Sequence, residues 1–232
     1  MSAKRSAQLK VFQEFLDLSP HEMLHPSQTR WLSLIAVVLR LLEQWAALIL
    51  YFTSVSLTEG LLTAMQILEW LRDPFIKMYF LFLQWVLPKF ADLNKYFQSS
   101  NVVVIDLHKK VEAMFKEILL AYMEGRYVDS TPVHMTDPNR RDKFKPDAQM
   151  YLGVGVANQL LHKDVINCTE RKREFFNRCR NFLIIGACEL KKRWDFNSPV
   201  LKQIQSLTPT RALSKAHRET VIKYKSVYSK VI

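Results

Sequence analysis

The chain has 232 residues, 49% hydrophobic and 12% aromatic, so it can bury a sizeable core and does not have the composition of a disordered chain. Only five glycines and nine prolines argue against a turn-rich β-sandwich. The net charge of +11 is unevenly spread: residues 1–125 contain 12 basic and 12 acidic side chains, whereas residues 168–232 contain 15 and 5. This segregated basic region indicates a polyanionic partner, and nucleic acid is favoured over a membrane surface.

The N-terminal segment is amphipathic and lacks the apolar run of a signal peptide, so we expect a nuclear or otherwise cytoplasmic protein. Two apolar stretches, residues 31–52 and 75–90, are interrupted by charges: Arg40 and Glu43 in the first and Lys77 in the second. A membrane span needs about 20 residues with few or no charges. Both stretches are therefore predicted to be buried core helices, and no membrane partner is expected.

Start and stop signals divide the first half of the chain into helices. The first is expected from Ser2 until Pro20 ends it, and the second over residues 27–52. Ser56 and Glu59 have the spacing of a capping box, which predicts that a third helix begins there and runs to about residue 72.

Asp73-Pro74 combines an N-cap with a residue that lacks an amide, and it predicts a fourth helix to about residue 97. Because a proline inside a helix removes a backbone hydrogen bond, we expect a kink or a break at Pro88. A stripe of apolar residues with a period of 3.6 predicts a fifth long helix: Val104, Leu107, Val111, Met114, Ile118 and Tyr122.

The rest of the chain contains a breaker-rich segment and then a basic helical region. Glycine and proline breakers predict a loop over residues 126–146, the segment we expect to be flexible or cleavable. Asn167 and Glu170 mark the start of another helix, and two short helical turns are expected at Ser198 and Thr208. The predicted fold is an all-α, irregular multi-helix bundle, divided into a helical bundle (1–125), a loop (126–146) and a basic helical segment (147–232) that packs on the same domain.

His-Glu-Met-Leu-His at 21–25 matches the zinc-peptidase pattern, in which two histidines one helical turn apart share a metal ion. Prolines at positions 20 and 26 flank it, and the second of them moves His25 away from helical dihedrals. No downstream motif offers a third ligand. A turn between two helices is the favoured interpretation, and neither a metal site nor a cofactor is expected.

Two other patterns are given structural interpretations. Gly153-Val154-Gly155 lacks the preceding strand, third glycine and lysine of a phosphate-binding loop. Cys168, Cys179 and Cys188 do not form the close pairs of zinc sites, so reduced core thiols are favoured.

Basic residues of the C-terminal region are the candidate nucleic-acid ligands: Arg171, Lys172, Arg173, Arg178, Lys191, Lys192 and Arg193. Cations at this density neutralise phosphates and release counterions, which gives binding that weakens with salt. A solvated charged face that only maintains solubility explains the same pattern. Trp194 is either a stacking residue for a base or an anchor in the core.

Three stretches resemble the hAT superfamily of transposases and the host proteins derived from them. The first is Leu-His-Pro-Ser-Gln-Thr-Arg-Trp-Leu-Ser-Leu at 24–34, continued by Arg-Leu-Leu-Glu-Gln-Trp at 40–45, and the second is Phe-Leu-Gln-Trp-Val-Leu-Pro-Lys-Phe at 82–90 with Leu-Asn-Lys-Tyr-Phe-Gln at 93–98. The third, which is similar more loosely, covers residues 184–196 and ends in Lys-Lys-Arg-Trp-Asp-Phe. The resemblance implies the helical domain that interrupts the family's RNase H-like nuclease, with that nuclease largely missing.

No catalytic carboxylate is transferred by this resemblance, so we expect no enzymatic activity. Trp31 matches the tryptophan of the family's arginine-tryptophan motif, which lies near DNA in active relatives, and Arg30 fits a phosphate contact. The alternative interpretation gives both residues structural roles: Trp31 fills the core and Arg30 forms an ion pair near the start of a helix. The resulting hypothesis is a non-catalytic, transposase-derived protein or fragment that binds DNA. A module that pairs with other transposase-like chains is the alternative.

Overall fold

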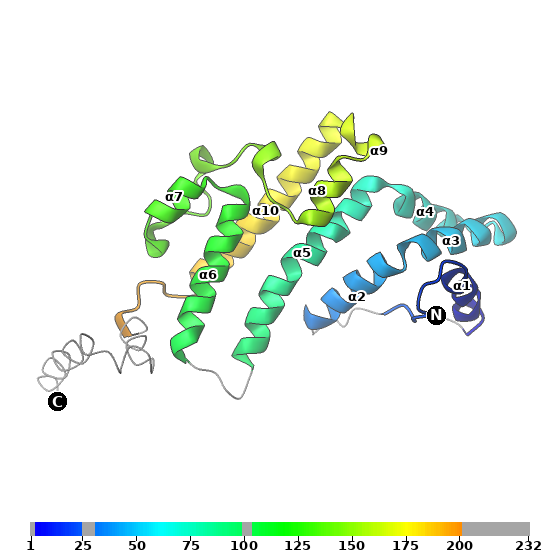
Figure 1. The fold of residues 1–232 in the computed structure, drawn as a ribbon, viewed down its shortest axis with the longest axis horizontal. Coiled ribbons are helices and arrows are strands. Elements are labelled where there is room, and N and C mark those ends of the chain that lie inside the picture. Colours follow the sequence, from blue (N-terminus) through cyan, green and yellow to red (C-terminus); the bar gives the residue numbers. More distant parts are fainter. Residues whose placement is uncertain (1–2, 25–30, 99–103, 201–232) are drawn as a thin grey trace, which may run out of the picture. The chain divides into compact units, whose positions relative to one another are not determined.

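The computed structural model describes residues 3–24, 31–98 and 104–200 (Figure 1). Within these residues the secondary structure is helical and contains no strand, which confirms the all-α multi-helix fold. The α-helices are α1 (Ala3–Phe15), α2 (Trp31–Glu43), α3 (Trp45–Glu59), α4 (Leu62–Arg72), α5 (Pro74–Phe97), α6 (Val104–Tyr122), α7 (Gly125–Ser130), α8 (Val154–Leu160), α9 (Lys163–Ile166) and α10 (Thr169–Arg193). Short 3-10 helices cover Val133–Met135, Arg141–Lys143 and Asp147–Gln149.

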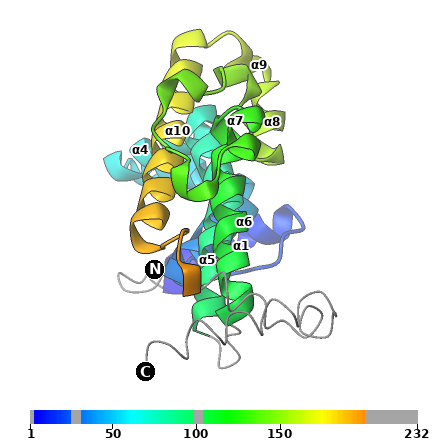
Figure 2. The same cartoon turned by 90° about the vertical axis from the view of Figure 1, so that its left-hand side faces the viewer.

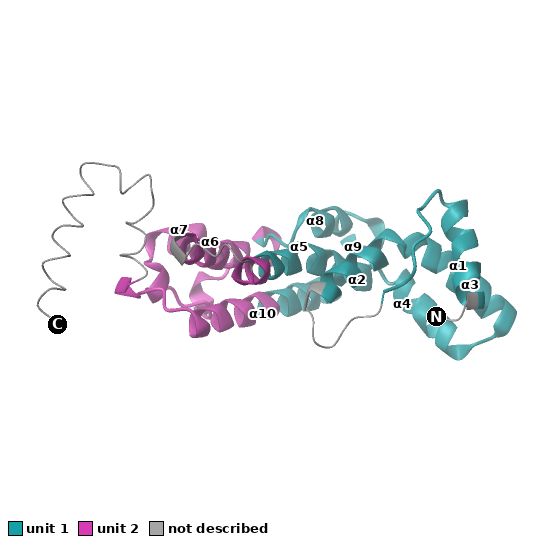
Figure 3. Cartoon of the chain, turned by 90° about the horizontal axis from the view of Figure 1, so that it is seen from below, with its two compact units in different colours: residues 1–92, 150–181 teal, residues 93–149, 182–232 magenta. Residues whose placement is uncertain are grey.

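The chain forms two compact units, coloured separately in Figure 3. Unit 1 comprises residues 1–92 and 150–181, and unit 2 comprises residues 93–149 and 182–232. These units do not follow the expected boundaries at 125 and 146, because α8, α9 and the first half of α10 belong to unit 1 together with the N-terminal helices. Helices α5 and α10 each contribute residues to both units, and α10 is one uninterrupted helix in both Figure 1 and Figure 2.

The apolar stretch from residue 31 to residue 59 forms two helices where one was expected up to residue 52. Helices α2 and α3 meet at Gln44 and are bent by 70°. The Gln44 side chain is fully buried, and its Nε2 donates to the carbonyl oxygen of Ser19 at 3.2 Å. A buried amide needs such a partner, so this hydrogen bond fixes the position of the bend against the segment that follows α1.

The expected capping box at Ser56 was wrong. Ser56 lies inside α3, where its hydroxyl donates to the carbonyl of Thr53. Helix α3 ends instead at Gly60, whose φ of 62° and ψ of 22° are left-handed, and α4 begins two residues later. Glycine adopts this conformation without the Cβ clash of other residues, which makes it the common helix terminator.

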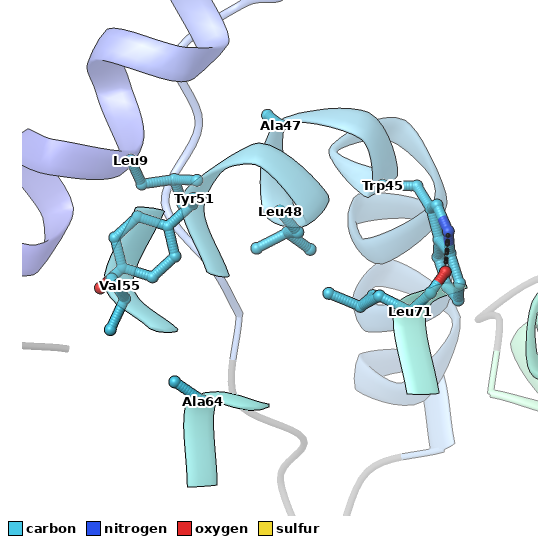
Figure 4. Close-up of a cluster of buried hydrophobic side chains, with 8 residues drawn as sticks. All are labelled: Leu9, Trp45, Ala47, Leu48, Tyr51, Val55, Ala64 and Leu71. Atoms are coloured by element: carbon cyan, nitrogen blue, oxygen red, sulfur yellow. Dashed lines mark hydrogen bonds between the residues drawn. The ribbon is translucent and has the colours of Figure 1, made fainter. Parts of the chain in front are cut away.

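A cluster of buried side chains holds α1, α3 and α4 together in unit 1 (Figure 4). Its members are Leu9, Trp45, Ala47, Leu48, Tyr51, Val55, Ala64 and Leu71. The indole Nε1 of Trp45 donates to the carbonyl oxygen of Leu71 at 3.0 Å, which is drawn as a dashed line in Figure 4. The start of α3 is thereby joined to the last turn of α4, and the buried indole nitrogen has a hydrogen-bond partner.

Helix α5 begins as predicted, because the Asp73 Oδ1 accepts a hydrogen bond from the amide of Phe75 at 2.9 Å. The prediction of a break at Pro88 was wrong, since α5 continues through this residue to Phe97. Val86, Leu87 and Ala91 around it are buried, and their packing offsets the backbone hydrogen bond that proline lacks.

The two glycines at 153 and 155 have a packing role in unit 1. Gly153 has a φ of 99°, and a Cβ there would lie 2.7 Å from the Cβ of Trp85. At Gly155 a Cβ would lie 2.9 Å from the Cδ2 of Leu81. The absence of side chains at both positions therefore allows α8 to approach α5 closely, in line with a structural interpretation of this pattern.

In unit 2, α6 buries the predicted stripe: Leu107, Val111, Met114, Ile118 and Tyr122. The segment 126–146, expected to be a loop, contains α7 and two 3-10 helices. The hydroxyl of Tyr122 donates to the carbonyl of Pro138 at 2.8 Å, and the hydroxyl of Tyr127 accepts from the amide of Asp137 at 3.0 Å. Two tyrosines thus hold the turns between these short helices with specific hydrogen bonds.

Among the described residues, no single helix is both long and apolar enough to cross a membrane. Helices α2 and α3 together meet the length and composition of a span, but they are bent at Gln44.

Candidate nucleic-acid interface

The structure gives no side-chain contacts for two of the predicted ligands, Arg30 and Trp31. Arg30 falls outside the described residues. Trp31 is the first residue of α2, and its side chain falls outside them as well. The DNA contacts suggested for this pair stay predictions.

Arg171 is held within unit 1. Its Nη2 lies 2.5 Å from Oδ2 of Asp73, and its guanidinium carbon lies 4.2 Å from the centre of the Phe75 ring. Asp73 also caps α5 through its other oxygen, so this carboxylate serves two helices at once. An arginine engaged by both a carboxylate and a ring is positioned to join α10 to the start of α5. We therefore interpret Arg171 as a structural residue.

Two lysines of α10 donate to backbone carbonyls. Nζ of Lys172 lies 2.7 Å from the carbonyl oxygen of Ile166, the last residue of α9, and Nζ of Lys191 lies 2.7 Å from that of Thr136. A cation at the end of a helix satisfies a free carbonyl and is favoured by the helix dipole. Lys191 also braces the segment that contains the buried Thr136. These contacts favour a structural interpretation for both lysines.

Arg173 and Arg178 are exposed on the part of α10 that belongs to unit 1. Arg173 pairs with Glu170 at 2.7 Å and Arg178 with Glu174 at 2.5 Å, both within one helical turn. The hydrogen bond to Glu174, with the nearby Tyr79, raises the pKa of Arg178 further above its ordinary value, so the guanidinium stays charged. Exposed pairs of this kind contribute little free energy, so both guanidinium groups can exchange their carboxylate for a phosphate.

Lys192 and Arg193 are exposed at the end of α10, in unit 2. Arg193 pairs with Glu189 at 3.0 Å on the same helix. Within the described part of the chain, no ion pair joins these two cations, Arg173 or Arg178 to another helix. The structure therefore separates the seven predicted α10 ligands into three used internally and four directed to solvent.

Trp194 is an anchor in unit 2. Its Nε1 donates to Nδ1 of His108 at 3.0 Å, and its ring lies edge-on to that of Phe97. The hydrogen bond requires Nδ1 of His108 to be unprotonated, so the proton of a neutral ring lies on Nε2. Buried His108 and Phe196 complete the aromatic group. Trp194 is half-buried, and this packing favours its interpretation as a core anchor over base stacking.

The described part of the zinc-peptidase pattern is not helical. His21 lies in the segment after α1, with Nδ1 3.0 Å from Oε1 of Glu43, and His25 falls outside the described residues. Within the described ranges no group of three or more potential metal ligands is found. The three cysteines are free thiols, and of these only Cys179 is buried.

One surface that sequence analysis missed lies on α4, where Glu69 and Arg72 are exposed on the face that carries Leu62 and Met65. All four residues lie in the helix predicted up to residue 72, and their spacing of three or four residues is the signal that places them on one face.

Comparison with protein-family models, with curated proteins and with solved structures finds no match to this chain. The arguments on function therefore depend on the residues themselves.

Proposed function

We propose that this chain is a non-catalytic, hAT transposase-derived protein of the nucleus that binds DNA through its basic C-terminal region. The observation that supports it most is the charge of residues 168–232, which hold 15 basic and 5 acidic side chains. Such an excess of cations attracts the phosphate backbone irrespective of base sequence. The resemblance at 24–34 supports the transposase lineage.

The described part of the interface consists of four exposed α10 cations that form no ion pair with another helix. Arg173 and Arg178 form one pair in unit 1, and Lys192 and Arg193 form another in unit 2. Their partners are carboxylates on the same helix or solvent, so a phosphate replaces a weak contact rather than a packed one. Arg171, Lys172 and Lys191 are excluded from this set because their heads are bound to Asp73 and to two backbone carbonyls.

The test measures binding of a fluorescent double-stranded DNA by anisotropy over a series of salt concentrations. Arg173→Gln with Arg178→Gln, and separately Lys192→Gln with Arg193→Gln, should weaken binding to every DNA sequence. Each lost phosphate contact should reduce the slope of log K against log salt by about 1, so each double variant should lose about 2.

Lys109→Gln with Lys163→Gln is the matched control. These lysines are exposed and carry the same total charge, but they lie outside α10. The control should keep the slope of the unmodified chain. Equal slopes for all three double variants would overturn the proposed interface, and an affinity that does not change with salt would overturn DNA binding through this region.

A further inference from the structure

The face of α10 that unit 1 leaves exposed carries polar side chains in a regular arrangement. Residues 169–181 are the part of α10 that belongs to unit 1. Because an α-helix has 3.6 residues per turn, positions four, seven and eleven residues after a given one lie along the same line of its surface. Four exposed residues have this spacing and lie within about 60° around the helix axis. They form what we call the α10 stripe: Glu170, Glu174, Asn177 and Asn181.

Two exposed arginines border the α10 stripe, one on each side. At about 100° of rotation per residue, Arg173 and Arg178 lie about 140° apart with the stripe between them. Arg173 pairs with Glu170 at 2.7 Å, and Arg178 pairs with Glu174. The face therefore has amides and carboxylates along its centre and a cation on either edge.

The two asparagines of the stripe are not explained by the stability of the helix. Asparagine is a poor helix former because its side chain competes for backbone hydrogen bonds, but both stand inside a helix of 25 residues. Asn177 Oδ1 accepts a hydrogen bond from Nη1 of Arg180 at 3.1 Å, and its NH₂ group has no acceptor within the described residues. The side chain of Asn181 has no hydrogen-bond partner within them at all. Both amides are therefore available to a ligand.

We propose that the α10 stripe enters the major groove of double-stranded DNA and contacts base edges, while Arg173 and Arg178 contact phosphates of the two strands. This inference rests on the DNA binding proposed above and adds a sequence preference to it. An asparagine amide forms two hydrogen bonds with N6 and N7 of adenine, and a carboxylate accepts from the N4 amino group of cytosine. The arginines exchange weak pairs within the helix for phosphates, which frees the carboxylates to face the bases.

The size and charge of this face suit B-form DNA. Its major groove is about 12 Å wide and admits an α-helix. The stripe is about 16 Å long, so it spans about five base pairs. Residues 169–181 hold five basic and two acidic side chains, and this excess of cations favours a polyanion over a neutral or acidic peptide. Double-stranded RNA is not expected to be read, because side chains cannot reach the bases in its narrow major groove.

The experiment selects duplexes with a random core of about 10 base pairs, twice the span of the stripe, by binding to the full chain. Fluorescence anisotropy then compares the most enriched duplex with a scrambled one. The unmodified chain should prefer the enriched duplex about 20-fold or more. Asn177→Ala and Asn181→Ala should each reduce this preference about 5-fold or more, and the slope of log K against log salt should not change.

The arginine variants should give the opposite response. Arg173→Gln with Arg178→Gln should reduce the salt slope and weaken binding to both duplexes, with the preference retained. Asn158→Ala is the matched control, since it changes an exposed asparagine of α8 in unit 1 and should alter neither quantity. Replacing adenines of the enriched core with 7-deazaadenine removes N7 from the major groove and keeps base pairing. This duplex should lose preference as the asparagine variants do.

Each contrary result identifies which proposal fails. Salt-dependent binding without any enriched sequence, or a preference that survives both asparagine substitutions, overturns the base contacts and leaves DNA binding in place. An equal preference for the 7-deazaadenine duplex, or for an RNA duplex of the same sequence, overturns the major-groove contact. Absence of salt-dependent DNA binding overturns the proposed function, and this inference with it. Circular dichroism confirms that each variant is folded.

Discussion

Replacing Gly153 with alanine tests whether the approach of α8 to α5 depends on two separate demands, one conformational and one steric. The φ of 99° and ψ of 154° lie in a region that residues other than glycine avoid, at a cost of roughly 1–3 kcal/mol. The added Cβ would also meet the Cβ and Cγ of Trp85 at 2.7 and 2.8 Å. These atoms lie next to the backbone of α5 and cannot move aside easily, which adds about 1–3 kcal/mol. The expected loss of unfolding free energy is therefore roughly 2–6 kcal/mol.

Two other glycines separate these contributions. Gly60 has a φ of 62° but nothing within 4 Å of a new Cβ, so Gly60→Ala should cost only the left-handed conformation, about 1–2 kcal/mol. Gly155 has no positive φ, and the contact of a Cβ there is with Cδ2 of Leu81, the end of a flexible side chain. The higher helix propensity of alanine, worth about 1 kcal/mol, should largely offset this contact in Gly155→Ala.

The measurement is urea unfolding of the three variants followed by circular dichroism, with the unmodified chain as the reference. We expect the loss to be largest for Gly153→Ala, intermediate for Gly60→Ala and smallest for Gly155→Ala. Losses of the same size at Gly60 and Gly153 would refute the steric contribution of Trp85. A Gly153→Ala variant within about 0.5 kcal/mol of the unmodified chain, the range of an ordinary surface substitution, would refute the whole argument.

Three further predictions concern a hydrogen bond, an ion pair and a thiol. Tyr122→Phe removes the buried donor to the carbonyl of Pro138 and should lower the unfolding free energy by about 1–2 kcal/mol in urea titrations. Burial opposes ionisation of Glu43, but its hydrogen bond and charge interaction with His21 prevail and lower its pKa. The stability from this carboxylate is present above the unfolded-state pKa and is lost as pH falls through the folded-state pKa. Glu43→Gln should therefore destabilise the chain more at about pH 6 than at about pH 3. Burial raises the pKa of the Cys179 thiol, which should resist alkylation at neutral pH until the chain is unfolded, as read by mass spectrometry.

Each of these three has a clear contrary result. Unchanged stability of Tyr122→Phe would mean that the Pro138 carbonyl has another partner. For Glu43→Gln, an equal loss at both pH values would show that the effect is packing rather than charge. Cys188 is exposed and serves as the accessible comparison, so alkylation of Cys179 as fast as Cys188 in the folded chain would contradict the burial of Cys179.

The parts of the fold that sequence predicts well are those governed by local pattern. The cap at Asp73 and the periodic stripe of α6 depend on residues within a few turns, and both were confirmed. The bend at Gln44 was missed because it depends on a carbonyl of Ser19, 25 residues earlier. Order in segment 126–146 was missed for a similar reason, since two of its hydrogen bonds come from Tyr122 and Lys191 on other helices and a third joins Tyr127 to Asp137 within the segment.

The contacts of the candidate binding residues could not be predicted from sequence either, because they depend on residues far along the chain. Seven α10 cations are equivalent in sequence, but Arg171 meets a carboxylate 98 residues away and Lys191 meets a carbonyl 55 residues away. Nothing in the spacing of basic residues distinguishes these from Arg178, whose partner lies one turn away. The density of basic residues predicts the kind of partner. Only the tertiary structure shows which of these cations are already bound within the protein and which are available to bind a phosphate.

Two of the three boundaries between the units fall inside α5 and α10. Any continuous fragment that contains all of one unit consequently carries part of the other: residues 1–181 include 93–149, and residues 93–232 include 150–181. Deletion mapping would thus leave cut helices with uncovered apolar faces, and a loss of activity in such pieces would report misfolding rather than a missing contact. Point substitutions at exposed positions are the sound way to locate function in this chain.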